Sequence, residues 1–371
     1  MTPFKIVRLP AFALGLLVPA LGFCGPDIEG YGILDSHYVN GPLFDDDEHD
    51  RFIFKVRRIK FSIEDKLRDN LEYKLAFKVD PEDGEFEWSD AYLEYEYSNT
   101  LSADIGRFKI PFGLENNQST KELPLQERSL ASELFTPGRR PGVALYWQPE
   151  WAAVYVGSFY LASEDKDYDD GYLNMARAFT HVGKAKKGLL HFGVSQTYQT
   201  AVDNNIQLES PIVASGIKDQ FESKKYDPQS VTTSNLEWGA LFKTLSLQGE
   251  WFNQNFDDPE EEFVRWQGGY LQVGFGLSGQ GRNYDDGEFS PDFNDKPFSE
   301  FTVRLSRVRL EDIREAVEAE SLSAAYALYP TKNTKVALQY QRGRKTTVKI
   351  KKSEQELESG SAWTLRLQFM F

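Results

Sequence analysis

The sequence ends in the stretch SAWTLRLQFMF, which covers residues 361–371. Every second residue of this stretch is apolar, namely Trp363, Leu365, Leu367, Phe369 and Phe371, and the residues between them include Thr364, Arg366 and Gln368. A period of two predicts a β-strand with one apolar and one polar face. In a soluble sandwich the apolar face would form the core. In a closed membrane barrel it would meet lipid, and the polar face would line water.

The same alternation recurs along the chain, and the connections between alternating runs differ in length. Residues 71–80, 245–251 and 336–340 alternate in this way, and about 16 such strands can be counted. Short turn signals lie at residues 68–70, 98–100, 149–150 and 331–333, whereas residues 40–50, 110–140, 162–171, 199–230 and 345–359 are long and polar. We therefore predict an all-β fold, a transmembrane antiparallel β-barrel of about 16 strands with short turns at one rim. The connection at residues 278–298 is unusually long for that rim.

The start of the chain predicts an export signal. Lys5 and Arg8 form a basic segment, an apolar run covers residues 12–18, and small residues follow at Ala20 and Gly22. We expect cleavage between residues 22 and 25, so that residues 1–24 are a signal peptide and residues 25–371 form the barrel. No later run reaches the roughly 20 apolar residues of a transmembrane helix. The expected location is the outer membrane of a Gram-negative bacterium.

Composition and motif spacing argue against several other functions. The formal net charge of −15 argues against nucleic acid as a partner. Cys24 is the only cysteine, and the four histidines show no metal-binding or catalytic spacing, so no catalytic residue and no enzyme are predicted. The GxGxxG pattern at residues 274–279 is not followed by a helix-forming stretch, and the acidic run at residues 45–50 is typical of an exposed loop. No cofactor and no metal are expected.

The second predicted strand carries an irregularity among basic residues. Its apolar residues change phase between Val56 and Ile59, across Arg57 and Arg58. A β-bulge there would let both arginines face the lumen, together with Lys60. Two interpretations remain open: a basic ladder for anions, or wall charge paired with lumen carboxylates. A similar change of phase at Ser306–Arg307 predicts that Arg304, Arg307 and Arg309 also point inward.

Residues 110–140 are the longest irregular stretch in the first half of the chain and would form the third external loop. A barrel of this size encloses a wide channel unless a segment folds into it, so we expect this loop to fold inward and form the constriction. Its basic residues Lys121, Arg128, Arg139 and Arg140 balance its acidic residues Glu115, Glu122, Glu127 and Glu133. The sign of ion selectivity therefore does not follow from this count.

Several stretches resemble the phosphate-selective porin O and P family. They are FKVRRIK at 54–60, DAYLEY at 90–95, GRFKIPFGLE at 106–115, QERS at 126–129, GRRPGV at 138–143 and FGLSG at 275–279. The resemblance implies a 16-stranded trimeric barrel whose third loop folds inward. It also implies an anion site built from the arginine pair of strand two, an aspartate of strand four and residues of the third loop.

Carried over residue by residue, that anion site comprises Arg57, Arg58, Asp90, Ser119, Thr120 and Lys121. Lys60 and Arg128 complete our set of candidate constriction residues. Family members that bind phosphate also place a basic residue in strand one, where this chain has Tyr31 and Ile33.

We expect a porin for passive diffusion of small hydrophilic solutes, with anions such as phosphate or polyphosphate as the selected class. A weakly selective or cation-preferring pore is the first alternative. A barrel enzyme and a non-conducting structural barrel are alternatives of other classes. The expected partners are outer-membrane lipid, permeating solutes or inorganic anions, further copies in the implied homotrimer, and the barrel assembly machinery, which would recognise Phe371.

Overall fold

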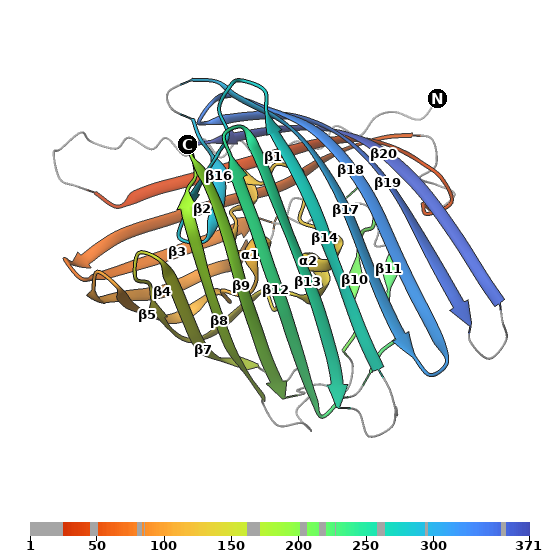
Figure 1. Cartoon of the computed structure of the whole chain (residues 1–371), viewed down its shortest axis with the longest axis horizontal. Helices are drawn as coiled ribbons and strands as arrows, with labels where there is room; N and C mark the ends of the chain where they lie inside the picture. Colours follow the sequence, from red (N-terminus) through yellow and green to blue (C-terminus); the bar gives the residue numbers. More distant parts are fainter. Residues whose placement is uncertain are drawn as a thin grey trace.

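The computed structural model describes residues 25–44, 51–79, 84, 86–161, 171–200, 206–214, 220–226, 228–257, 264–293, 296–349 and 354–371. Within these residues, sixteen antiparallel strands close into one barrel (Figure 1). They are β1 (Asp27–Asn40), β2 (Arg51–Arg68), β3 (Leu71–Val79), β4 (Phe86–Ser98), β5 (Leu101–Lys109), β6 (Arg139–Trp147), β7 (Ala152–Leu161), β8 (Gly171–Lys184), β9 (Gly188–Thr200), β12 (Ser230–Phe242), β13 (Leu245–Asp257), β14 (Val264–Gly276), β17 (Phe298–Asp312), β18 (Glu315–Thr331), β19 (Thr334–Lys349) and β20 (Glu354–Met370). The predicted signal peptide and the acidic run at residues 45–50 lie outside the described residues.

The barrel wall follows the two-residue period of its strands. In β20, Trp363 and Leu365 are exposed on the outer surface, whereas Thr364 and Arg366 are buried on the lumen side. Strand β20 pairs with β1 to close the barrel, and residues 30 and 371 exchange two backbone hydrogen bonds of 2.9 and 3.0 Å. An apolar exterior around a polar interior is the pattern of an outer-membrane barrel, so the predicted fold is confirmed.

The two rims of the barrel differ in the length of their connections. Two-residue turns at 69–70, 99–100 and 332–333 lie at the rim that holds the end of β20, as predicted. We assign this rim to the periplasm, because short turns face that side in outer-membrane barrels. The predicted loop at 345–359 is wrong in its bounds, because β19 continues to Lys349 and β20 begins at Glu354.

The strand registers test the two predicted changes of phase. Between β1 and β2 the register shifts between Ile33 and Leu34, which leaves Arg57 as the extra residue and confirms the predicted bulge. The registers of β17 with β14 and β18 run without a break past residue 306, so the second predicted change of phase is wrong. Strict alternation from the inward-facing Arg304 therefore turns Arg307 and Arg309 to the outer surface.

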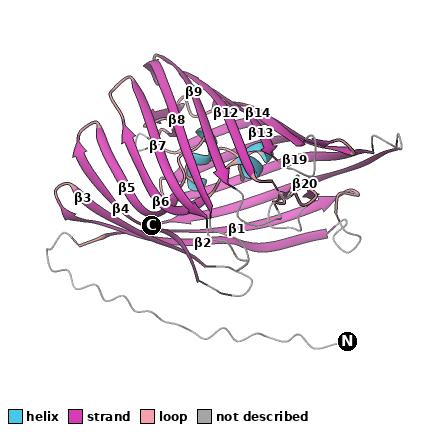
Figure 2. Cartoon of the chain, turned by 90° about the horizontal axis from the view of Figure 1, so that it is seen from below, coloured by secondary structure: helices cyan, strands magenta, loops and turns pink. Residues whose placement is uncertain are grey.

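Three segments fold into the barrel and occupy its lumen, and the helices among them are visible inside the wall in Figure 2. Loop 3 (residues 110–138) contains α1 (Leu114–Asn117), the 3₁₀ turn η1 (Thr120–Glu122) and α2 (Leu130–Phe135). Loop 5, described at residues 206–214, 220–226 and 228–229, contains β10 (Glu209–Ser210) and β11 (Phe221–Glu222). No helix in the described part of the chain is long and apolar enough to cross a bilayer. Buried side chains of loops 3 and 5 form one cluster with lumen-facing wall residues, so the main core lies inside the barrel.

The long periplasmic connection, described at residues 277–293 and 296–297, forms a β-hairpin that returns into the lumen. Its strands are β15 (Arg282–Asp285) and β16 (Glu288–Pro291). Asp286 and Gly287 join them with φ angles of 46° and 81°, as a two-residue hairpin turn requires. Phe289 is buried in a cluster with Leu114 of loop 3. We call this segment the periplasmic hairpin.

Polar contacts fix the periplasmic hairpin to the wall and to loop 3. Arg282 donates to both carboxylate oxygens of Glu300 on β17, at 3.0 and 2.7 Å, and to the carbonyl oxygen of Glu122 in loop 3, at 2.9 Å. The hydroxyl of Tyr284 lies 2.8 Å from Nδ1 of His191 on β9. The periplasmic hairpin therefore supports loop 3 from its periplasmic side.

Candidate pore constriction

Loop 3 is attached to the wall opposite β2 through buried carboxylates. The backbone N–H groups of Leu114 and Glu115 donate to the two carboxylate oxygens of Glu250 on β13, at 2.8 and 2.9 Å. Glu115 accepts in turn from Arg304 on β17, and from the backbone N–H of Ser129 at 2.8 Å. Each carboxylate thus satisfies donors that would otherwise be buried without an acceptor, which holds the loop in place.

Glu127 of loop 3 lies between guanidinium groups from two wall strands. Arg57 donates to its carboxylate from Nε at 3.1 Å and from Nη2 at 3.3 Å, and Arg366 on β20 donates at 2.6 Å. Arg366 also donates two hydrogen bonds to Asp35 on β1, at 2.8 and 2.7 Å. Burial alone would raise the pKa of Glu127, but the charges of Arg57, Arg366 and Arg58 hold that pKa well below its usual range. A charged carboxylate therefore ties loop 3 to this side of the wall.

The other strand-two residues also contact partners on the same side of the lumen. Arg58 donates from Nη1 to the hydroxyl of Thr120 at 3.1 Å. Lys60 donates to Asp90 on β4 at 2.9 Å, and Asp90 also accepts from Nε of Arg139 on β6 at 2.7 Å. Five of the candidate constriction residues, together with Arg139, thus lie along one face of loop 3.

The remaining candidates occupy three different environments. The ammonium group of Lys121 pairs with Glu29 at 3.0 Å near the periplasmic rim. Arg128 is turned into loop 3, where it donates to three backbone carbonyl oxygens at 2.8 to 3.3 Å. Ser119 faces open space beside the wall. Arg128 therefore stabilises the fold of the loop, while Ser119 and Lys121 line open space beside it.

Two cavities of about 520 and 580 Å³ lie between loop 3 and the wall. The first reaches the periplasmic rim at Phe371, and the second extends along the wall to Arg139. Lys60, Lys74 and Ser119 line both cavities. Two lysines and a serine therefore border both cavities, and we call this shared border the junction.

Our candidate set left out several charged residues that line these cavities, among them Lys74 and Glu288. Lys74 lies on the polar face of the run at 71–80, so the alternation already contained the signal that it faces the lumen. It forms an ion pair with Glu64 on β2. Glu288 belongs to the periplasmic hairpin and faces the second cavity. Nothing in the pattern around residue 288 indicates that this connection folds inward far enough to reach the pore.

We expect Glu288 to make ion permeation sensitive to pH. Burial raises the pKa of this hairpin carboxyl to about 7, although the positive charges of Lys109 and Arg177 oppose the shift and Glu122 and Asp286 add to it. The carboxyl is neutral below that pH and negative above it, so we expect a higher anion-to-cation permeability ratio at pH 6 than at pH 8. Reversal potentials at the two values would measure the change. A pH dependence that persists in Glu288→Gln would contradict this assignment.

A closed sixteen-stranded barrel with a lipid-facing exterior and a lumen narrowed by inward loops defines an outer-membrane porin. Residues 32–371 match the family model of the phosphate-selective porin O and P group, and the chain belongs to this family. Porin O of Pseudomonas aeruginosa is 23% identical over 345 residues, which cover 81% of this chain and 78% of that protein.

Solved structures with the same architecture support the fold. The anion-selective porin from Comamonas acidovorans superimposes with a TM-score of 0.61 at 12% identity, covering 94% of this chain and 99% of that one. OmpT of Vibrio cholerae, folded in vitro and in its trimer form, gives a TM-score of 0.57 at 11% identity and covers 94% and 100%. At these identities the likeness concerns the barrel alone.

Proposed function

We propose that this porin passes small inorganic anions, such as phosphate, along the wall formed by β2 to β6. The observation that carries the proposal is the junction of the two cavities, where Lys60 and Lys74 are the charged residues that line both. The names of the family and of the anion-selective Comamonas porin point to the same class of solute. No enzymatic activity is proposed.

The mechanism is replacement of the hydration shell by protein donors. An ammonium group has three N–H donors, and Lys60 and Lys74 each give one to a wall carboxylate, Asp90 and Glu64 respectively. The remaining donors, with the hydroxyl of Ser119, can face an anion at the junction. Because the carboxylates offset part of the positive charge, an anion is held weakly enough to leave again.

The arginine pair of strand two has a different role in this proposal. Arg57 is paired with Glu127, and Arg58 is bonded to Thr120, so both are engaged with loop 3. We assign them to holding the constriction in position and to contributing positive potential, while Lys60, Lys74 and Ser119 contact the ion. Lys121, at the periplasmic end, extends the basic path toward the rim.

Removing the charge of both junction lysines should weaken anion preference. In a planar bilayer under a salt gradient, we expect the reversal potential of the wild type to show that anions permeate more readily than cations. Lys60→Gln/Lys74→Gln should lower the anion-to-cation permeability ratio by about tenfold, equivalent to about 1.4 kcal/mol. Lys78→Gln is the matched control, because Lys78 lies on the same strand face and is paired with Glu87 but lines neither cavity. An unchanged ratio in the double variant would contradict the proposal.

A weakly selective pore is the second candidate, and the second cavity supplies the observation that favours it. Its lining includes the basic residues Lys60, Lys74, Lys109, Arg139 and Arg177 and the acidic residues Asp90, Glu94, Asp104, Asp286 and Glu288. Equal numbers of the two signs would leave little net field if all were charged. A wild-type reversal potential near zero would favour this candidate over the anion pore.

Three further features belong to the same proposal. Residues 1–24 would direct export and be removed. The mature chain would assemble as a homotrimer, the form named for the outer-membrane protein OmpT of Vibrio.

Phe371, which packs near Phe61 with ring centroids 6.0 Å apart, would be recognised by the assembly machinery before the barrel closes. Phe371→Ser should therefore lower the amount of folded porin in the outer membrane.

A further inference from the structure

Charged side chains cover part of the outer surface of the wall formed by β17 to β19. They are Arg307, Arg309, Glu311, Glu318, Glu320, Arg342 and Arg344. Arg307 and Arg344 are 60% and 59% exposed, so these side chains reach away from the wall. An outward-facing position of a membrane barrel normally carries an apolar residue, because charge within the hydrocarbon layer is unfavourable.

The position of this charged cluster along the strands is informative. On β19 the outward-facing residues below Arg342 and Arg344 are Tyr340, Leu338 and Val336, which continue down to the periplasmic rim. Arg344 stands only five residues before β19 ends, at Lys349. The cluster therefore borders the apolar band on its extracellular side, at the level of the lipid headgroups of the outer leaflet.

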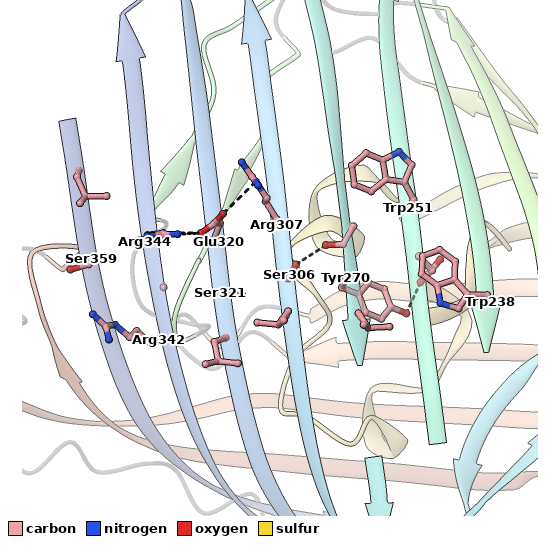
Figure 3. A pocket seen from close by; sticks show the side chains of 17 residues that line it. Trp238, Trp251, Tyr270, Ser306, Arg307, Glu320, Ser321, Arg342, Arg344 and Ser359 are labelled. Carbon is pink, nitrogen blue, oxygen red and sulfur yellow. Dashed lines mark hydrogen bonds and ion pairs between the residues drawn. The ribbon is translucent and has the colours of Figure 1, made fainter. Parts of the chain in front are cut away.

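An apolar groove adjoins the cluster on the outer surface (Figure 3). It measures about 800 Å³, and the exposed side chains of Trp251, Leu271, Leu305 and Leu322 contribute to its lining. Gly269 lies among them, and a Cβ atom there would come within 2.8 Å of the Trp251 ring. Because Gly269 has no side chain, the outer surface is recessed beside Trp251.

The charges around the groove do not cancel. Glu320 bridges Arg307 and Arg344, at 3.4 and 2.7 Å, and Glu318 accepts from Arg307 at 2.7 Å. Figure 3 shows Glu320 between Arg307 and Arg344, with Arg342 set apart from them. Within the described residues, Arg342 has neither a carboxylate nor a hydrogen-bond partner, although it is exposed and lines the groove. Four arginines against three glutamates leave one guanidinium in excess.

We propose that this face binds a phosphorylated lipid of the outer leaflet, with a phosphate on Arg342 and Arg344 and an acyl chain in the groove. A planar guanidinium matches the oxygens of a phosphate group, and Arg344 keeps donors free beyond the two N–H groups that Glu320 accepts. The groove opens among lipid-facing leucines, so a chain lying in it remains continuous with the hydrocarbon layer. This site goes beyond the proposed transport function, because none of these side chains faces the lumen.

Native mass spectrometry of the full-length mature porin in detergent tests the site, with diphosphoryl lipid A as the probe. We expect the probe to bind wild type, Arg342→Gln to weaken binding about fivefold, and Arg342→Gln/Arg344→Gln to weaken it about 25-fold. Fully dephosphorylated lipid A should bind at the level of the double variant. The double variant leaves Glu320 paired with Arg307, so no carboxylate is stranded.

Lys184→Gln is the matched control, because Lys184 is an exposed outward-facing cation at the opposite, periplasmic edge. It should bind the probe as wild type does. Channel conductance should be unchanged in all three variants, and this readout also shows that they are folded. Equal binding of the phosphorylated and dephosphorylated lipids, or no loss in Arg342→Gln, would overturn the proposal. A photo-cross-linking residue at Leu322 that captures a second copy of the chain would overturn it too, by assigning the face to subunit contact.

Discussion

Removing the periplasmic hairpin should raise single-channel conductance by roughly twofold or more, because current through a pore is limited by its narrowest water-filled section. The suitable variant joins Ser278 to Pro297 by a two-residue Asn-Gly turn. Strands β14 and β17 are already neighbours at this rim, where the backbone N–H of Leu277 donates to the carbonyl of Ser299 at 2.8 Å. A tight turn can therefore close the gap without moving either strand.

The deletion needs one compensating change to be informative. Arg282 and Glu300 form a buried ion pair, and deletion of the arginine alone would leave a buried carboxylate without its partner. The variant should therefore include Glu300→Gln. Tyr284→Phe is the control, because it removes the hydroxyl bonded to His191 but keeps the hairpin in place, and its conductance should remain that of wild type. If the deletion variant inserts normally and its single-channel conductance equals that of wild type, loop 3 alone limits the conductance and the prediction is wrong.

The strands were predictable because their signal is local. Alternation in runs such as 71–80 and 361–371 fixes both the strand and the face of each side chain, since lipid lies on one side and water on the other. The bulge at Arg57 was predictable for the same reason, because the apolar phase changes across it. The phase change at residue 306 was misleading, since Val308 and Leu310 are apolar but face the packed interior beside loops 3 and 5.

Contacts inside the lumen were not predictable, because they join residues far apart in the sequence. Nothing local to Glu127 indicates that its partners are Arg57 and Arg366, which lie 70 and 239 residues away. The periplasmic hairpin had a weak local signal, because the Asp286–Gly287 pair is typical of a two-residue hairpin turn. Its direction into the barrel depends on Phe289 and Arg282 finding partners on other strands and on loop 3.

Replacing Glu127 with glutamine should increase anion preference strongly. The substitution keeps the size of the side chain and an acceptor for Arg57, but removes the negative charge that Arg57, Arg58 and Arg366 share. Asp35 still neutralises Arg366, so the gain in positive potential falls mainly on Arg57 and Arg58. We expect the anion-to-cation permeability ratio to rise by about tenfold, equivalent to about 1.4 kcal/mol, measured as a shift of reversal potential.

Glu127→Asp separates the effect of charge from the effect on the loop. It keeps the negative charge but shortens the reach to the wall, so it should loosen loop 3 and leave the permeability ratio close to that of wild type. If both substitutions raised open-channel noise and neither moved the reversal potential, Glu127 would act only as a mechanical tie between loop 3 and the wall. If only the glutamine variant shifts the ratio, the arginines of β2 shape the potential that a permeating anion meets. In that case the carboxylate of loop 3 sets how much of their charge the anion experiences.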